Sequence, residues 1–131
     1  MTIPARLTVA LGLLAVLPGA PAYSKSNTDQ MLSLAPRARM EQRCNARAMG
    51  LISREHKGMR PDELVAYAFA DTVETGGKVD APGAAVRSTG KWYHLSYTCQ
   101  TNDNGMGVSS FSYTLGEVVP HQQWAEHYLV P

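Results

Sequence analysis

The strongest pattern of apolar and polar positions in the chain is helical and spans residues 36–55. Pro36 suits the first turn of a helix, where its missing N–H would have no partner, and good helix formers follow it. At 100° per residue, several apolar residues fall within about one third of the helix circumference: Met40, Cys44, Ala48, Leu51 and Ile52. The pattern predicts one long helix with Cys44 in the middle of its buried stripe.

Beyond Pro61 the period of the pattern changes from 3.6 to 2. In DELVAYAFAD, residues 62–71, large apolar residues alternate and predict a strand, although a short helix stays open. Residues 74–78 are typical of a turn. Residues 78–88 then predict a second strand, which Pro82-Gly83 interrupts with a bulge or kink that indicates a sheet edge.

The clearest strand of the chain is predicted for residues 91–101, after a turn at Thr89-Gly90. One face of this strand is apolar, with Tyr93, Leu95, Tyr97 and Cys99, and the other is mostly polar, with Trp92, His94, Ser96, Thr98 and Gln100. Residues 102–105 are a strong hairpin turn, and residues 106–115 predict a fourth strand. A short terminal helix is expected from Pro120, with Trp124 and Tyr128 covering an edge or end of the sheet.

These elements predict an α+β fold in which one long N-terminal helix packs on a four-stranded antiparallel sheet. Cys44 lies on the core stripe of the helix and Cys99 on the core face of the third strand, by two separate counts. We therefore expect a disulfide between helix and sheet, which closes a loop of about 55 residues and contributes roughly 4 kcal/mol. Two free thiols or metal ligands are the alternatives, and the absence of CxxC spacing argues against zinc.

The first 22 residues have the three-part layout of a secretory signal peptide, with Arg6, an apolar run over residues 7–17, and small residues up to Ala22. The run is about eleven residues, shorter than the roughly twenty that span a bilayer. We expect cleavage after Ala22, a periplasmic or secreted protein, and no stable membrane insertion after cleavage; an uncleaved anchor or a buried helix is the alternative. Residues 23–30 are predicted to be a flexible leader and residues 31–131 a single domain.

Charge adds a local feature to this picture. The chain has 12 basic and 11 acidic residues, and Arg6 would leave with the signal peptide, so overall charge gives no reason to expect nucleic acid as a partner.

The helical count places four arginines on one face: Arg39, Arg43, Arg47 and Arg54. We call them the arginine stripe. The stripe suits an anionic partner such as a phosphate or an acidic glycan; alternatively, these are solvated side chains whose stems cover apolar surface.

The sequence gives little support for an enzyme active site. No GxSxG, P-loop, GxGxxG or HExxH motif occurs, and His121 and His127 are six residues apart, which does not favour a metal site. We expect no cofactor. His94 and Ser96 project from the same strand face, where Asp71 or Asp80 could approach, so a hydrolase that uses His94 stays open.

A second candidate surface combines an aromatic ring with polar groups around residues 87–94. Arg87, Ser88, Trp92 and His94 could stack on a sugar or hold a side chain of a partner. The alternative is that the terminal helix covers Trp92 and that the residue is only structural.

Four segments resemble a known bacterial family: RARMEQRCNARAM, PDELVAYAFAD, APGAAVRSTGKWYHLSYTC and VSSFSYTLGEVVPHQQW. In this order they are similar to the domain of unknown function numbered 930, found mainly in alphaproteobacteria, and the resemblance covers about residues 32–129. It implies an envelope-associated domain with both cysteines in the positions of its paired pattern, and it supplies no catalytic residue. Val86 stands where similar sequences commonly have phenylalanine.

Taken together, the sequence favours an exported, non-catalytic binding or structural protein of the cell envelope, whose partner is an envelope protein or a glycan. The alternatives are a hydrolase directed at the cell wall that uses His94, and an inhibitor of a hydrolase.

Overall fold

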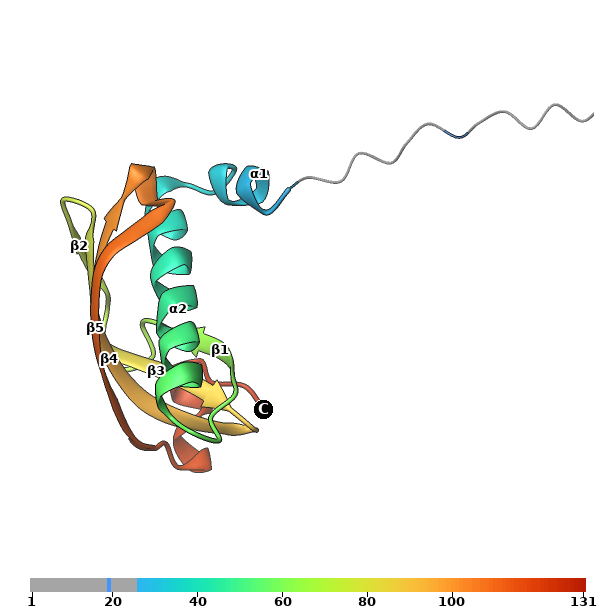
Figure 1. Ribbon diagram of the computed structural model, residues 1–131. Coiled ribbons are helices and arrows are strands. Elements are labelled where there is room, and N and C mark those ends of the chain that lie inside the picture. The colour runs from blue at the N-terminus through green and yellow to red at the C-terminus, as the bar shows by residue number, and fades with distance from the viewer. Residues whose placement is uncertain (1–18, 20–25) are drawn as a thin grey trace, which may run out of the picture.

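In the computed structural model, residue 19 and residues 26–131 are described, and the fold is α+β. Two helices, α1 (Asn27–Leu32) and α2 (Pro36–Glu55), precede the sheet. The predicted signal peptide and its cleavage site lie outside the described residues, apart from Gly19. Figure 1 shows the sheet curving around α2, which lies along one of its faces.

The helix α1 begins inside the predicted leader 23–30 and was not expected from the sequence. A capping box starts it: the Ser26 hydroxyl accepts a hydrogen bond from the backbone N–H of Asp29, and the Asp29 carboxylate accepts one from the backbone N–H of Ser26. The long helix is therefore the second helix of the described residues, with the bounds that the pattern predicted. Its buried residues include Met40, Cys44, Ala48 and Ile52.

The antiparallel sheet has five strands in place of the four expected, with β1, β3, β4 and β5 in that order and β2 paired to β3. Their bounds are β1 Pro61–Val65, β2 Val73–Thr75, β3 Lys78–Ser88, β4 Lys91–Asn102 and β5 Gly107–Val118. Thr89 and Gly90, both with positive φ, form the two-residue turn between β3 and β4, and a 3₁₀ turn, Asp103–Gly105, joins β4 to β5.

The strand predicted over residues 62–71 is wrong beyond Val65, where the chain leaves the sheet and returns as β2. β1 and β2 both pair with β3, and between them the backbone N–H of Phe69 donates to the carbonyl of Gly83 at 2.7 Å. A Cβ on Gly83 would lie within 3 Å of the backbone of Phe69 and Ala70, so this close approach requires glycine. The edge strand is broken because the backbone of residues 69–70 approaches β3 at Gly83.

The bulge predicted at Pro82-Gly83 is confirmed by a register shift between Ala81 and Ala84 in the pairing of β3 with β4. The inference that β3 is an edge strand is wrong, because β1 and β2 pair with its other side. Pro82 is tolerated there because the outer strand is interrupted at the same level, so the missing N–H leaves no ladder partner unsatisfied.

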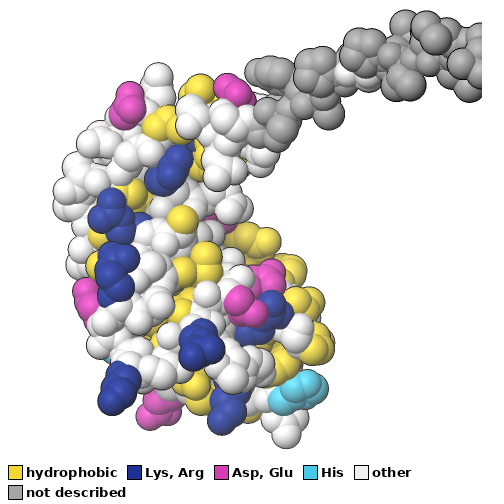
Figure 2. Space-filling model, turned by 45° about the vertical axis from the view of Figure 1, so that its right-hand side comes forward, with side chains coloured by type: hydrophobic (Ala, Val, Ile, Leu, Met, Phe, Trp, Pro, Cys, Tyr) yellow, Lys and Arg dark blue, Asp and Glu magenta, His cyan; other side chains and the backbone are white. Residues whose placement is uncertain are grey.

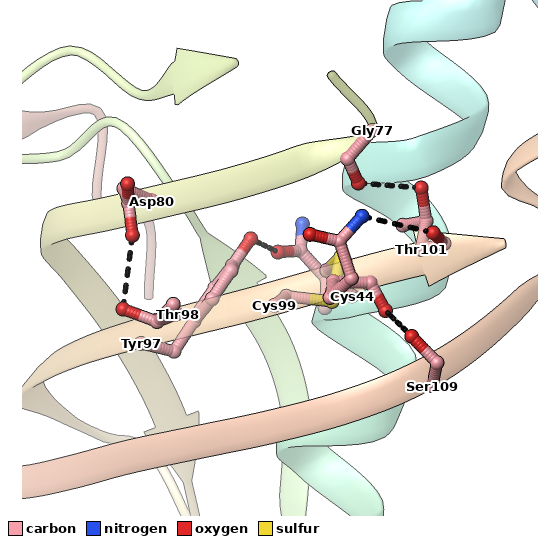
Figure 3. The surroundings of a disulfide bond; sticks show 10 residues. Cys44, Gly77, Asp80, Tyr97, Thr98, Cys99, Thr101 and Ser109 are labelled. Carbon is pink, nitrogen blue, oxygen red and sulfur yellow. Dashed lines mark hydrogen bonds between the residues drawn. A yellow bond between two sulfur atoms is a disulfide. The ribbon is translucent and has the colours of Figure 1, made fainter. Parts of the chain in front are cut away.

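The disulfide between Cys44 and Cys99 joins the middle of α2 to β4, as predicted, with the two Cα atoms 6.0 Å apart (Figure 3). Both cysteines are fully buried in the core between α2 and the sheet. Beside them the Tyr97 hydroxyl donates to Oδ1 of Asn45 at 2.8 Å, which adds a second link between β4 and α2.

A second, smaller core lies on the opposite face of the sheet, which the sequence pattern had indicated to be mostly polar. It is formed by Val65, Ala68, Ala85, Trp92, Val119 and Leu129. The predicted terminal helix is present as two 3₁₀ turns, His121–Gln123 and Ala125–His127. Trp124 packs against this core as expected, but the prediction for Tyr128 is wrong, because this side chain is 65% exposed.

Replacing both cysteines, Cys44→Ala and Cys99→Ala, is expected to lower the free energy of unfolding by about 4 kcal/mol, because the bridge constrains a 55-residue separation in the unfolded chain. Urea unfolding with and without reductant measures this loss. The native protein should respond to reductant and the double variant should not. Equal stability of the two proteins would contradict a stabilising bridge.

The stability is expected to fall in alkali because burial raises the pKa of Tyr97 above its ordinary value of 10.0, with the Glu41 charge adding to the effect. Above about pH 10 the unfolded chain loses the phenolic proton of Tyr97 while the folded protein keeps it. The contribution of Tyr97 to stability is therefore constant below about pH 10 and declines as the pH rises further. Tyr97→Phe should lower the free energy of unfolding by about 1–3 kcal/mol at neutral pH, because Asn45 loses its hydrogen-bond partner. The stability of this variant should nevertheless decline less steeply above pH 10 than that of the native protein. Parallel curves of unfolding free energy against pH would contradict this assignment.

Candidate functional site

The predicted surface of Arg87, Ser88, Trp92 and His94 does not exist as one accessible patch. Trp92 is fully buried, and its Nε1 donates to the backbone carbonyl of Val130 at 2.7 Å. Ser88 is 2% exposed, and its hydroxyl accepts a hydrogen bond from the backbone N–H of Arg60. The prediction of an exposed tryptophan is therefore wrong, and the structural alternative holds, because the C-terminal tail covers the ring.

Arg87 is held by groups of its own chain. Its guanidinium forms ion pairs with Asp62 at 2.9 Å and Glu63 at 3.1 Å, and donates to the backbone carbonyl of Pro131 at 2.9 Å. It also lies over the Trp92 ring, 5.6 Å from the ring centre. The hydrogen bond from Arg87 lowers the pKa of Asp62. Arg87 thus ties β1 and β3 to the C-terminus.

His94 lies on the outer face of the sheet, beside a shallow hollow of about 290 Å³ whose lining includes Ser96 and Thr114. The Phe69 ring packs 4.5 Å from the His94 ring and 4.0 Å from the His127 ring, measured between centres. The expectation that His94 and Ser96 share a face is confirmed. The sequence pattern did not indicate that Phe69 would join them, because Phe69 was assigned to a strand.

An orienting acid for His94 is missing from the described part of the chain. Asp80 accepts a hydrogen bond from the Thr98 hydroxyl at 2.9 Å and pairs with Lys78 at 3.5 Å, and no hydrogen bond joins His94 to Asp71 or Asp80. A second hollow of about 380 Å³ continues along this face, lined by hydroxyl groups that include Thr98 and Ser112. The outer face is thus rich in hydroxyls and offers no assembled triad among these residues.

The arginine stripe divides into two parts with different environments. Arg39 is structural: its guanidinium donates to the carbonyls of Met31, Leu32 and Leu34 at 2.9–3.1 Å. These carbonyls belong to the C-terminal end of α1 and the residues after it, where backbone acceptors have no helical partner. A fourth bond, to the carbonyl of Asn104, fixes the turn before β5. Arg39 therefore anchors α1 and is removed from the candidate binding residues.

The other three arginines, Arg43, Arg47 and Arg54, line one hollow of about 330 Å³ between α2 and the start of β5. We call it the arginine hollow. Its opposite wall is Met106, Gly107 and Val108. In the described part of the chain none of the three guanidinium groups forms an ion pair, and Nε of Arg43 is a buried side-chain nitrogen without a hydrogen-bond partner. Figure 2 shows dark blue Lys and Arg side chains following one another along one side of the molecule.

The lining of the arginine hollow includes Gly50 of α2. A Cβ on Gly50 would lie 3.4 Å from Nη1 of Arg54, at ordinary contact distance from the end of a flexible side chain. Glycine in the middle of a helix costs roughly 1 kcal/mol relative to alanine, so the helix accepts a local loss of stability here.

A polar cluster that the sequence pattern did not reveal closes the C-terminal end of α2. The Tyr113 hydroxyl donates to Oε2 of Glu55 at 2.6 Å, and Nε2 of His56 lies 3.2 Å from the same hydroxyl. Desolvation and the bond to Glu55 raise the pKa of Tyr113 to about 12. The available signal was the position of Tyr113 on the inward row of the last strand, opposite the helix end. The cluster fixes α2 to β5.

Two further observations concern the part of the chain that the structure describes. Within residue 19 and residues 26–131, no three His, Cys, Asp or Glu side chains gather as a metal site would require. In the same residues, no helix has the length and apolar character to cross a bilayer.

Comparison with protein families matches residues 31–129 to the family described as Domain of Unknown Function (DUF930). The chain belongs to the DUF930 family. The resemblance inferred from the four segments is thereby confirmed. No curated protein and no solved structure matches the chain. The DUF930 assignment brings no activity with it, so function must be argued from the surfaces described above.

Trp92→Ala is expected to lower the free energy of unfolding by about 3–5 kcal/mol, because a fully buried ring and its bond to the Val130 carbonyl are lost. Trp124→Ala, which removes a half-buried ring on the same side of the sheet, is the matched control and should cost less. Urea unfolding followed by circular dichroism measures both losses. An equal or smaller loss for Trp92→Ala would contradict the buried position of this ring.

Proposed function

We propose that the protein is an exported, non-catalytic binding domain of the cell envelope that binds an acidic glycan through the arginine hollow. The observation that carries the proposal is that Arg43, Arg47 and Arg54 line one hollow without a carboxylate partner in the described part of the chain. Three cations at one place repel one another, and an anion is the partner that relieves this repulsion.

The contrast with other arginines of the chain supports this choice. Arg37 pairs with Glu74 at 3.8 Å, Arg87 pairs with two acids, and Arg39 is bonded to backbone carbonyls. Beyond the predicted signal peptide the chain has equal numbers of acidic and basic residues, so acids were available to pair with the hollow. Lys57, Arg60 and Lys91 also form no ion pair among the described residues, so the arginine hollow is distinguished by the gathering of three guanidinium groups at one place.

The chemistry of the arginine hollow suits carboxylate or phosphate groups carried on a sugar chain. Guanidinium presents paired N–H donors that match the two oxygens of such a group. A volume of about 330 Å³ is at the lower end of ligand pockets, which fits one charged sugar unit better than a large ligand. The hollow is open, so its attraction is screened by salt, and binding is expected to weaken as ionic strength rises.

Export and the absence of catalysis are supported by separate observations. Residues 1–22 have the pattern of a signal peptide, and a disulfide that joins two layers of a small domain is typical of an oxidising compartment. His94 has the Phe69 ring beside it and no orienting acid among the described residues. These observations favour a binding role over the alternative of a hydrolase that uses His94.

Binding is tested by titrating the purified protein with oligogalacturonate, which carries carboxylates, with polyphosphate, and with neutral dextran. We expect the two anionic probes to bind and dextran not to bind. The double variant Arg47→Gln/Arg54→Gln should weaken binding by about a hundredfold, because two charge-assisted contacts are lost. Isothermal titration calorimetry at two salt concentrations measures the affinities and their screening.

Arg37→Gln is the matched control, since Arg37 lies on the same helix and is paired with Glu74 outside the arginine hollow. This variant should bind as the native protein does. The relative affinity for oligogalacturonate and polyphosphate identifies the preferred anionic group. Failure of both probes to bind, or equal weakening by Arg37→Gln, would overturn the proposal.

A further inference from the structure

The two edges of the sheet differ in how they are protected against pairing with another strand. One edge is formed by β1 and β2, which are short, separated by a loop, and carry Pro61, Asp62 and Glu63. Proline, charge and short length are the usual means of preventing edge-to-edge association. The other edge is β5, a strand of 12 residues in which Glu117 is the charged residue. In the described part of the chain, only β4 is paired with β5.

The core is incompletely closed at the β5 edge. On β4, three of the residues that face α2 are almost fully buried: Leu95, Tyr97 and Cys99 are 0–4% exposed, while Tyr93 at the start of the strand is half-buried. On β5, the equivalent residues are only half-buried, although they pack against the same core: Phe111, Tyr113 and Leu115. Val118, at the end of β5, is 47% exposed. A further strand beside β5 would cover this row of apolar side chains.

The outer row of β5 offers no obstacle to such a neighbour. It consists of Ser110, Ser112 and Thr114, which are exposed and uncharged. These residues pair across the sheet with Gln100, Thr98 and Ser96 of β4, so their backbone already has strand geometry. A long free edge of this composition is a template for one more strand.

We propose that β5 pairs antiparallel with β5 of a second copy, which joins the two sheets into one. A register centred on Tyr113 makes the edge complementary to itself. Phe111 then lies opposite Leu115 of the second copy, Val108 opposite Val118, and Ser112 opposite Thr114. Both bulges of β5 also match in this register, because one lies near residue 109 and the other near residues 116–117.

Charge supports a second copy as the occupant. With Tyr113 at the centre, Glu117 lies opposite Ser109 of the second copy and never opposite itself. Gly107 and Val108, next to that position, form one wall of the arginine hollow. Glu117 of each copy is thus brought toward the arginine hollow of the other copy. This two-fold arrangement is the isologous contact that closes a dimer without further growth.

Charged substitutions in the outer row of β5 test the proposal. The double variants Ser112→Lys/Thr114→Lys and Ser112→Glu/Thr114→Glu each place like charges directly opposite one another across the two copies, which is destabilising. Sedimentation velocity across a dilution series is expected to show a dimer for the native protein and about tenfold weaker association, or more, for each double variant. An equal mixture of the two variants should restore the dimer, since lysine then faces glutamate.

The matched control is Ser96→Lys/Thr98→Lys, which adds the same charge to the same face one strand further in and should leave association unchanged. A native protein that is monomeric at every concentration would overturn the proposal. So would a control that dissociates as the β5 variants do, or a mixture that stays monomeric. If the variants do not fold, hydrogen exchange of the native protein decides: the amides of β5 that point away from β4 should lose protection on dilution, and unchanged exchange contradicts the dimer.

Discussion

The packing of α2 across the sheet depends on the bond between Cys44 and Cys99. The core around this bond includes four alanines, Ala48, Ala66, Ala81 and Ala84, which bury little apolar area each. A covalent link from the middle of the helix to β4 fixes the distance between the layers where hydrophobic burial is modest. Tyr97 with Asn45, and Tyr113 with Glu55, then fix the helix along its length.

The C-terminal tail determines which part of the outer sheet face is accessible. Its last residues cover Trp92 and are held by Arg87, so one end of this face becomes a second small core. The rest of the face remains open and carries hydroxyl groups. The same aromatic ring that suggested a binding surface is therefore part of the scaffold, and the candidate surfaces that remain lie on α2 and β5.

Elements that are set by local periodicity were predictable from the sequence, and those set by distant contacts were not. Hydrophobic periods of 3.6 and 2 residues predicted the bounds of α2 and the disulfide. The turn at Thr89-Gly90 was indicated by its own residues. The break between β1 and β2 depends on Gly83, and the burial of Trp92 on Val130, both far away in sequence. Helix α1 is a different case, because Ser26 and Asp29 form a capping box that was readable from the chain.

The candidate binding residues could be predicted only as a set, because helical spacing placed four arginines together but gave no information on their partners. Arg39 is not in the remaining set, because its guanidinium donates to carbonyls at the C-terminal end of α1 and in the turn before β5. The three that remain lie where α2 meets Met106–Val108, and the unprotected edge of the sheet begins at the same place. The start of β5 is thus a wall of the arginine hollow and the first part of the free edge. An anion bound in the hollow and a second copy paired along β5 would both act on this one segment, so each would change the affinity for the other.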